Sequence, residues 1–136
     1  MAWSFTSRAP VYMQIVSRIR ADILGGVYQP DQQIPAVRQL ALTAGVNPNT
    51  MQRAFAVLEA EQLFITRGTI GRFITTDTEV LARAREVMRR ETVARLVEEA
   101  AAVGISPEEL IEGIRAYERE SAAADTDEAS QETTTQ

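Results

Sequence analysis

The sequence contains no cysteine, no histidine and no lysine in its 136 residues. Without cysteine and histidine there is no disulfide framework, no thiol nucleophile, no Ser-His triad and no zinc site of the usual ligands. Without lysine there is no Schiff base and no Walker phosphate clamp. Because no paired carboxylates fall in a segment that resembles a pocket, we predict that the protein is not an enzyme and that it uses no metal or other cofactor.

Long apolar runs are also missing. No stretch approaches the roughly 20 apolar residues that a membrane span needs, and the N-terminus lacks the charged-then-apolar layout of a signal peptide. We therefore expect a cytoplasmic protein without a membrane partner. A chain of 136 residues with 45% hydrophobic content can bury one ordinary core and a small helical appendage.

The charge is unevenly distributed. Fourteen arginines stand against 19 acidic residues, and the net charge of −5 taken alone argues against a nucleic-acid partner. Residues 1–76, however, hold seven arginines and four acids, whereas residues 77–136 hold seven arginines and 15 acids. The first segment is thus at +3 and the second at −8. This asymmetry suggests a DNA-facing half and a solvated or self-associating half.

Three helices are predicted in the first half. Apolar residues at three- and four-residue spacing indicate an amphipathic helix within residues 10–26, followed by a short extended stretch at 33–34. A second helix is expected over 36–44, and a third over 48–61. Gly45 supplies a left-handed residue after the second helix, while Asn47 and Pro48 start the third. Two short helices joined by such a turn are typical of a helix-turn-helix, whose second helix enters the major groove of DNA.

The hydrophobic period changes after Gln62. Two β-prone runs, 63–66 and 72–76, lie on either side of a turn that contains Gly68 and Gly71, which predicts a β-hairpin. A hairpin directly after a helix-turn-helix is a wing. The predicted fold is therefore mostly α with a small β-hairpin, and residues 1–76 form a winged helix-turn-helix DNA-binding domain.

A second helical block follows. We expect one helix over about 78–103 and, after Gly104, a last helix that begins at Ser106 and Pro107 and ends near 120. An aliphatic face on a long helix cannot bury itself alone, so residues 77–120 are predicted to be a two-helix dimerisation region. Residues 121–136 have little apolar surface and are predicted to be a disordered tail.

Four segments together carry a resemblance to a known family. They read PVYMQI at 10–15, IPAVRQLA at 34–41, VNPNTMQRA at 46–54 and LEAE at 58–61. In this order and spacing they resemble the GntR transcriptional regulators over about residues 9–76. The pair of helices after the wing, in place of a large effector domain, is similar to the short YtrA-like branch. The resemblance implies a dimeric DNA-binding regulator, more often a repressor than an activator.

The resemblance also suggests DNA contacts. It places Arg38 against the DNA backbone or a base, and Thr50 against a phosphate through its hydroxyl and the helix N-terminus. Many family members carry an arginine where this chain has Pro48, so base reading must shift to neighbouring residues. Alternatively, Arg38 is an exposed arginine that pairs with an acid, and Thr50 simply caps its helix.

The third helix and the wing supply the remaining candidates. Asn49 and Gln52 can each form two hydrogen bonds with adenine, and Arg53 can reach guanine or a phosphate. Their alternative role is solvated helix surface. In the wing the candidates are the two arginines, whose side chains suit the minor groove, and the residues of the turn. These wing residues are Arg67, Gly68, Thr69, Gly71 and Arg72. Family wing tips usually have one residue between the glycines, whereas here there are two, and an arginine beside a turn is often only solubilising.

The function predicted from these features is sequence-specific transcriptional regulation. The resemblance to the family implies that this regulation is repression. A homodimer is expected to place two recognition helices in successive major grooves of a pseudo-palindromic operator in double-stranded DNA. The sequence does not identify a small-molecule effector. An architectural or replication-accessory DNA binder would share the fold but show little sequence discrimination. An adaptor that uses the winged helix for protein contacts would have negligible DNA affinity.

Overall fold

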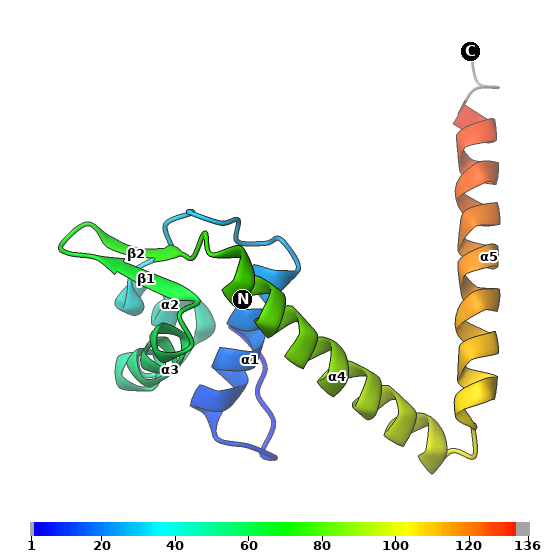
Figure 1. Cartoon of the computed structure of the whole chain (residues 1–136), viewed down its shortest axis with the longest axis horizontal. Coiled ribbons are helices and arrows are strands. Elements are labelled where there is room, and N and C mark those ends of the chain that lie inside the picture. The colour runs from blue at the N-terminus through cyan, green and yellow to red at the C-terminus, as the bar shows by residue number, and fades with distance from the viewer. Residues whose placement is uncertain (1, 133–136) are drawn as a thin grey trace. The chain divides into compact units, whose positions relative to one another are not determined.

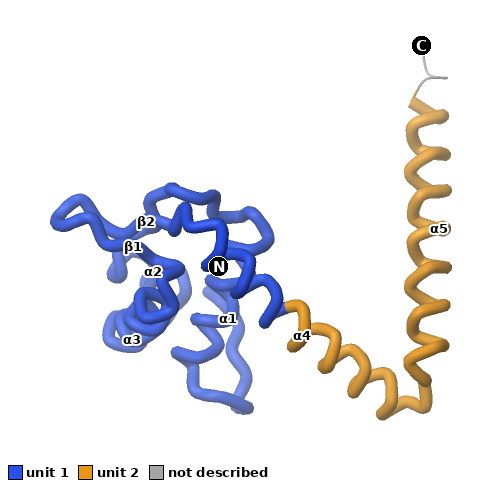
Figure 2. The backbone as a smooth tube through the Cα atoms, viewed as in Figure 1, with its two compact units in different colours: residues 1–88 blue, residues 89–136 orange. Residues whose placement is uncertain are grey.

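The structure is a computed structural model, and it describes residues 2–132. Its elements are α1 (Val11–Leu24), α2 (Val37–Ala44), α3 (Pro48–Ala60), β1 (Phe64–Arg67), β2 (Gly71–Ile74), α4 (Thr78–Ala102) and α5 (Pro107–Glu132) (Figure 1). The chain forms two compact units, residues 1–88 and 89–136 (Figure 2). The predicted fold class, mostly helical with one hairpin, is confirmed.

The core of the first unit lies between α1 and α3. In α1 the buried residues recur every three or four positions, and Ile15 and Ile19 are completely buried. The facing residues of α3 include Met51 and Phe55, which are also completely buried. The Phe55 ring meets the Phe64 ring of β1 edge-on, with 5.1 Å between the ring centres. The helical periodicity of the sequence therefore predicted the buried faces of both helices.

The turn between α2 and α3 is built as the sequence predicts. Gly45 has a φ of 75°, and its N–H donates to the carbonyl of Ala41 at 2.9 Å. The Asn47 side chain accepts a hydrogen bond of 2.8 Å from the Asn49 N–H, and Pro48 occupies the first helical turn. These interactions fix the start of α3 and hence the direction of its first side chains.

The wing is an antiparallel hairpin in which Phe64 pairs with Ile74 and Arg67 pairs with Gly71. The extended stretch before α2 hydrogen-bonds to the other edge of β2. The Ile34 N–H donates to the Arg72 carbonyl at 3.0 Å, and the Ile74 N–H donates to the Gln32 carbonyl at 2.9 Å. Strand β2 is therefore held on both sides, and only the tip of the hairpin projects from the domain (Figure 1).

The first unit extends past the predicted boundary at Thr76. The side chain of Asp77 accepts hydrogen bonds from the N–H groups of the first turn of α4. Val80, in that turn, is buried in the core, and Leu81 and Ala84 pack against it. The compact unit ends at Met88, because the first turns of α4 cover part of the winged-helix core.

The second unit consists of the rest of α4 and of α5. The Ser106 hydroxyl accepts from the Glu109 N–H at 3.2 Å, which confirms the predicted start of the last helix. This helix continues to Glu132 instead of ending near 120, so the prediction of a disordered tail is wrong for residues 121–132. Alanine and glutamate in this segment favour helix intrinsically even where little apolar surface is buried. Residues 133–136 of the predicted tail lie outside the described residues. Within residues 2–132 no helix is both long and apolar enough to span a membrane.

Candidate nucleic-acid interface

The outer face of α3 is polar. Asn49, Gln52 and Arg53 are exposed, while the core residues of the same helix point to the opposite side. Thr50 is half-buried in the first turn; its N–H donates to the Asn47 carbonyl at 3.0 Å, whereas its hydroxyl has no hydrogen bond among the described residues. The predicted base-reading residues therefore share one accessible surface, and Thr50 lies at its N-terminal end.

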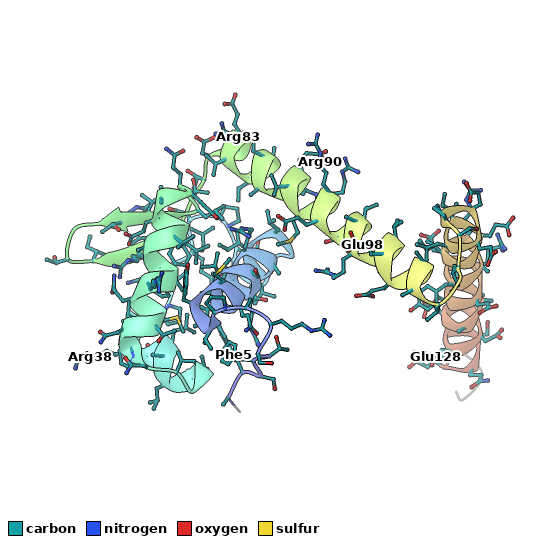
Figure 3. The ribbon with its side chains drawn as sticks, turned by 90° about the horizontal axis from the view of Figure 1, so that it is seen from below. Phe5, Arg38, Arg83, Arg90, Glu98 and Glu128 are labelled. Atoms are coloured by element: carbon teal, nitrogen blue, oxygen red, sulfur yellow. The ribbon has the colours of Figure 1, made fainter. Side chains whose placement is uncertain are left out.

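Arg38 is exposed in the first turn of α2 and lies at the outer edge of the helix-turn-helix (Figure 3). Within residues 2–132 no acidic side chain forms an ion pair with it. The alternative that Arg38 merely pairs with a neighbouring acid thus finds no support in the structure. Its positive charge remains available to an external anion.

Arg53 makes a contact that the sequence did not predict. Its guanidinium carbon lies 3.9 Å from the centre of the Tyr12 ring, in the first turn of α1. Tyr12, Asn49, Thr50 and Arg53 line one shallow hollow together with Pro10 and Val11. The helical periodicity of residues 10–26 gave no indication of which α3 residue Tyr12 would contact.

The two wing arginines are both paired with acids. Arg67 forms an ion pair with Asp31 and lies over the Phe73 ring at 4.3 Å. Arg72 is half-buried and forms an ion pair with Glu59 of α3. Asp31 and Glu59 therefore belong to the candidate interface, although pairings across 36 and 13 residues left no local signal in the sequence.

The tip of the wing is a tight turn between Arg67 and Gly71. The Ile70 N–H donates to the Arg67 carbonyl at 3.0 Å, and Gly68 has a φ of 53°. At Gly71 the φ is 132°, and a Cβ atom there would lie 2.7 Å from Nε2 of Gln33. The same Gln33 nitrogen donates to the Ile70 carbonyl at 2.8 Å, which fixes the base of the turn. This register leaves Gly68, Thr69 and Ile70 exposed.

Two groups of the first unit have shifted pKa values. Burial raises the pKa of Asp22, and the nearby positive charge of Arg18 lowers it by a smaller amount. Burial also raises the pKa of Tyr28, with a further increase from the nearby Asp22 charge. Among residues 2–132 no three acidic side chains are grouped as a metal ion would need. The chemistry that the arrangement offers is recognition by hydrogen bonds and positive charge.

A helix-turn-helix with a polar, arginine-bearing second helix, followed by a hairpin, defines a winged-helix DNA-binding protein. Residues 11–74 match the model of the bacterial regulatory proteins of the gntR family. The HTH-type transcriptional regulator YhcF of Bacillus subtilis is 31% identical over 113 residues, which cover 83% of this chain and 93% of that protein. The chain therefore belongs to the GntR family of DNA-binding transcriptional regulators.

Two further similarities refine this assignment. The HTH-type transcriptional repressor YtrA of Bacillus subtilis is 31% identical over 110 residues, covering 80% of this chain and 85% of YtrA. A GntR family transcriptional regulator from Listeria monocytogenes has a similar structure, with a TM-score of 0.71 and 30% identity over 82% of this chain and 97% of that one. The resemblance to the short YtrA-like branch is thus confirmed.

A complex with DNA is also among the similar structures. The DNA-binding domain of AraR, solved with operator ORX1, matches with a TM-score of 0.50 and 26% identity over 55% of this chain and 99% of that domain. That match covers about the length of the winged helix. The operator in that structure is the one bound by AraR.

Proposed function

We propose that the chain represses transcription as a homodimer that binds a pseudo-palindromic operator. The observation that carries the proposal is the exposed surface of the helix-turn-helix. There, Arg38, Asn49, Gln52 and Arg53 have no carboxylate partner among residues 2–132. A polar, cationic surface on the recognition helix suits the major groove. The similarity to the operator-bound AraR domain and to the repressor YtrA supports this assignment.

The contacts follow from the position of each side chain. Asn49 and Gln52 read adenine edges in the major groove, and Arg53 donates to a guanine or a phosphate. Arg38 and the Thr50 hydroxyl bind the sugar-phosphate backbone and set the register.

The wing contributes through its tip and one of its arginines. Gly68, Thr69 and Gly71 approach the minor groove, and Arg67 enters it after releasing Asp31. Arg72 has the smaller role, because it is half-buried and paired with Glu59.

The second unit provides the dimer interface. Large apolar side chains on α4, on α5 and in the turn between them remain exposed in the single chain, at fractions between 43% and 73%. They are Val93, Leu96, Val103, Ile111, Ile114 and Tyr117. Helices with such faces need another surface to cover them, and a second copy of the chain offers the same residues in a symmetric contact. Dimerisation then sets the distance between two recognition helices.

The direct test is to sequence the DNA that the purified protein selects from its own genome, and then to measure its affinity for selected and random DNA at several salt concentrations. Log affinity should fall linearly with log salt. Arg38→Ala should weaken binding to both kinds of DNA and reduce the slope by about one unit. The matched control is Arg83→Ala, an exposed arginine of α4 that lies away from Arg38 (Figure 3).

Two results would contradict the proposal. Equal affinity for selected and random DNA would favour the architectural alternative. No binding even at low salt would favour the adaptor alternative, because the electrostatic contribution of a DNA-binding surface is largest there.

A further inference from the structure

The arginines around the helix-turn-helix are held in two different ways. Arg20, Arg67 and Arg72 each form an ion pair with a carboxylate, of Glu61, Asp31 and Glu59 respectively. Arg53 instead has its guanidinium carbon over the Tyr12 ring, 3.9 Å from the ring centre. Within residues 2–132 its guanidinium has no hydrogen bond and no ion pair. Arg18 of α1 likewise lies over the Trp3 ring, 4.1 Å from its centre. Arg53 is thus the arginine of the recognition helix α3 that is oriented but not neutralised.

This difference matters for recognition. A carboxylate uses the in-plane N–H groups of a guanidinium and cancels its charge, whereas a stacked ring occupies only the face. The in-plane donors of Arg53 therefore stay available for an external acceptor. A guanidinium held in a fixed plane also loses less conformational freedom when it binds than a free arginine would.

The position of Tyr12 suits it for this role. Its ring is half-buried and packs against the core, so the platform beneath Arg53 is itself fixed. The hollow that both residues line also contains Asn49 and Thr50, and no carboxylate. The guanidinium over Tyr12 consequently shares this hollow with Asn49 and Thr50.

We propose that Tyr12 is a specificity-determining positioning residue, which holds the guanidinium of Arg53 so that its two parallel donors meet a guanine edge in the major groove. The inference rests on the operator binding proposed above. Guanine offers O6 and N7 as a pair of acceptors that a planar fork matches, and this match requires a defined plane. Tyr12 acts through Arg53 and need not contact DNA itself.

The first measurement uses the free full-length protein. In nuclear magnetic resonance spectra the Hδ and Hε signals of Arg53 should be shifted by the ring current of Tyr12. Tyr12→Phe should keep that shift, because the ring remains, and Tyr12→Leu should abolish it. A shift that is absent from the wild type, or unchanged in Tyr12→Leu, would overturn the proposed stacking.

The second measurement is a double-mutant cycle on the selected operator with Tyr12→Leu and Arg53→Ala. Tyr12→Leu should weaken operator binding by about 3- to 30-fold, the range that cation–π contacts span, while Tyr12→Phe should stay within about twofold. In the Arg53→Ala background Tyr12→Leu should have almost no further effect. On random DNA the loss should be below about threefold, since the charge of Arg53 remains near the phosphates.

Controls separate this role from simple packing. Tyr28→Leu replaces another half-buried tyrosine that packs on the core, and it should leave operator selectivity unchanged. Thermal unfolding of each variant shows whether the domain is folded. Equal losses from Tyr12→Leu with and without Arg53, or wild-type selectivity in Tyr12→Leu, would overturn the inference while leaving operator binding intact. A wild type without selective binding would overturn the proposed function, and this inference with it.

Discussion

The two compact units differ most in how they bury their apolar side chains. In the first unit, the described residues 2–88 enclose a core of 16 buried hydrophobic residues, and seven of the larger ones are almost completely shielded. In the described part of residues 89–136 the buried hydrophobic residue is Ala100. The first unit therefore has the means to fold alone, and the second has not, because helices without a core gain little from packing.

The charges follow the same division. Residues 89–136 contain 12 acids and five arginines, whereas the exposed arginines of the recognition surface lie in the first unit. DNA phosphates repel the acidic second unit. Orientations in which this unit faces the duplex are therefore disfavoured. The overall net charge of −5 is thus compatible with DNA binding, because most of the acids belong to the second unit and the recognition surface belongs to the first.

The strongest test of this comparison separates the two units. A fragment of residues 1–88 should be a folded monomer whose affinity for a single half-site equals that of the full chain. On a paired site its affinity should be lower by about 100- to 10,000-fold, because the linkage between two half-sites is lost. Binding to single and paired half-sites at one salt concentration, with the mass measured in solution, checks this result.

The spacing of the half-sites provides the control. Their centres should lie about 34 Å apart or a multiple of that distance, so inserting about five base pairs should remove the advantage of the full chain. Equal affinity of fragment and full chain for the paired site, or a full chain that stays monomeric at micromolar concentration, would contradict the assigned role of the second unit.

The fragment ends at Met88 and not at Thr76, and this difference shows which features of the fold the sequence alone could predict. Caps and breakers such as Gly45, Asn47 and Pro48 act on neighbouring residues, so the helix boundaries and the helix-turn-helix were predicted well. The domain end was predicted at Thr76, where the predicted hairpin finishes. The structure includes Val80 in the core, and this is a tertiary contact that local patterns do not encode.

The site shows the same limit. Helical periodicity placed Asn49, Gln52 and Arg53 on the outer face of α3 correctly. The partners of the arginines, Asp31 and Tyr12, come from other elements and were missed, because which side chains meet depends on how elements pack. The DNA contacts of Asn49, Gln52 and Arg53 stay predictions.

The second test contrasts a core aromatic with an exposed one. Phe55 is completely buried and packs on Phe64, whereas Tyr117 of α5 is 71% exposed. Phe55→Ala should lower the free energy of unfolding by about 3–5 kcal/mol through the cavity it leaves. Tyr117→Ala should leave the unfolding of the first unit unchanged and act only on self-association. Thermal unfolding and mass in solution, measured on both variants, distinguish the two effects; a large loss of first-unit stability in Tyr117→Ala would break the comparison.

A third test resolves functions within the first unit. Asn49→Ala and Gln52→Ala should each weaken operator binding by about 1–3 kcal/mol, because a base edge loses its hydrogen bonds. Binding to random DNA should change much less, and stability should change little since both side chains are exposed. Equal losses on operator and random DNA would make them backbone contacts, and specificity would then come from Arg53, the wing or the shape of the DNA.

The smallest expected effect concerns an acid beside the wing. Asp31 pairs with Arg67, and its φ of 67° is a conformation that asparagine tolerates. Asp31→Asn removes a negative charge from the proposed DNA-facing side and releases Arg67, which keeps its contact with Phe73. Since exposed ion pairs contribute at most about 1 kcal/mol, DNA affinity should rise by about two- to fivefold at low salt, and the gain should shrink as salt screens the charges.

The matched control for Asp31→Asn is Asp125→Asn, which changes the net charge equally but lies exposed on α5 of the second unit. If the position of the charge matters, Asp125→Asn should leave DNA affinity unchanged across the salt series. An equal gain in both variants would show that total charge alone governs binding, and would remove the electrostatic distinction between the two units. An unchanged affinity in Asp31→Asn would place Arg67 outside the DNA contacts and leave the wing to act through the turn at Gly68 and Thr69.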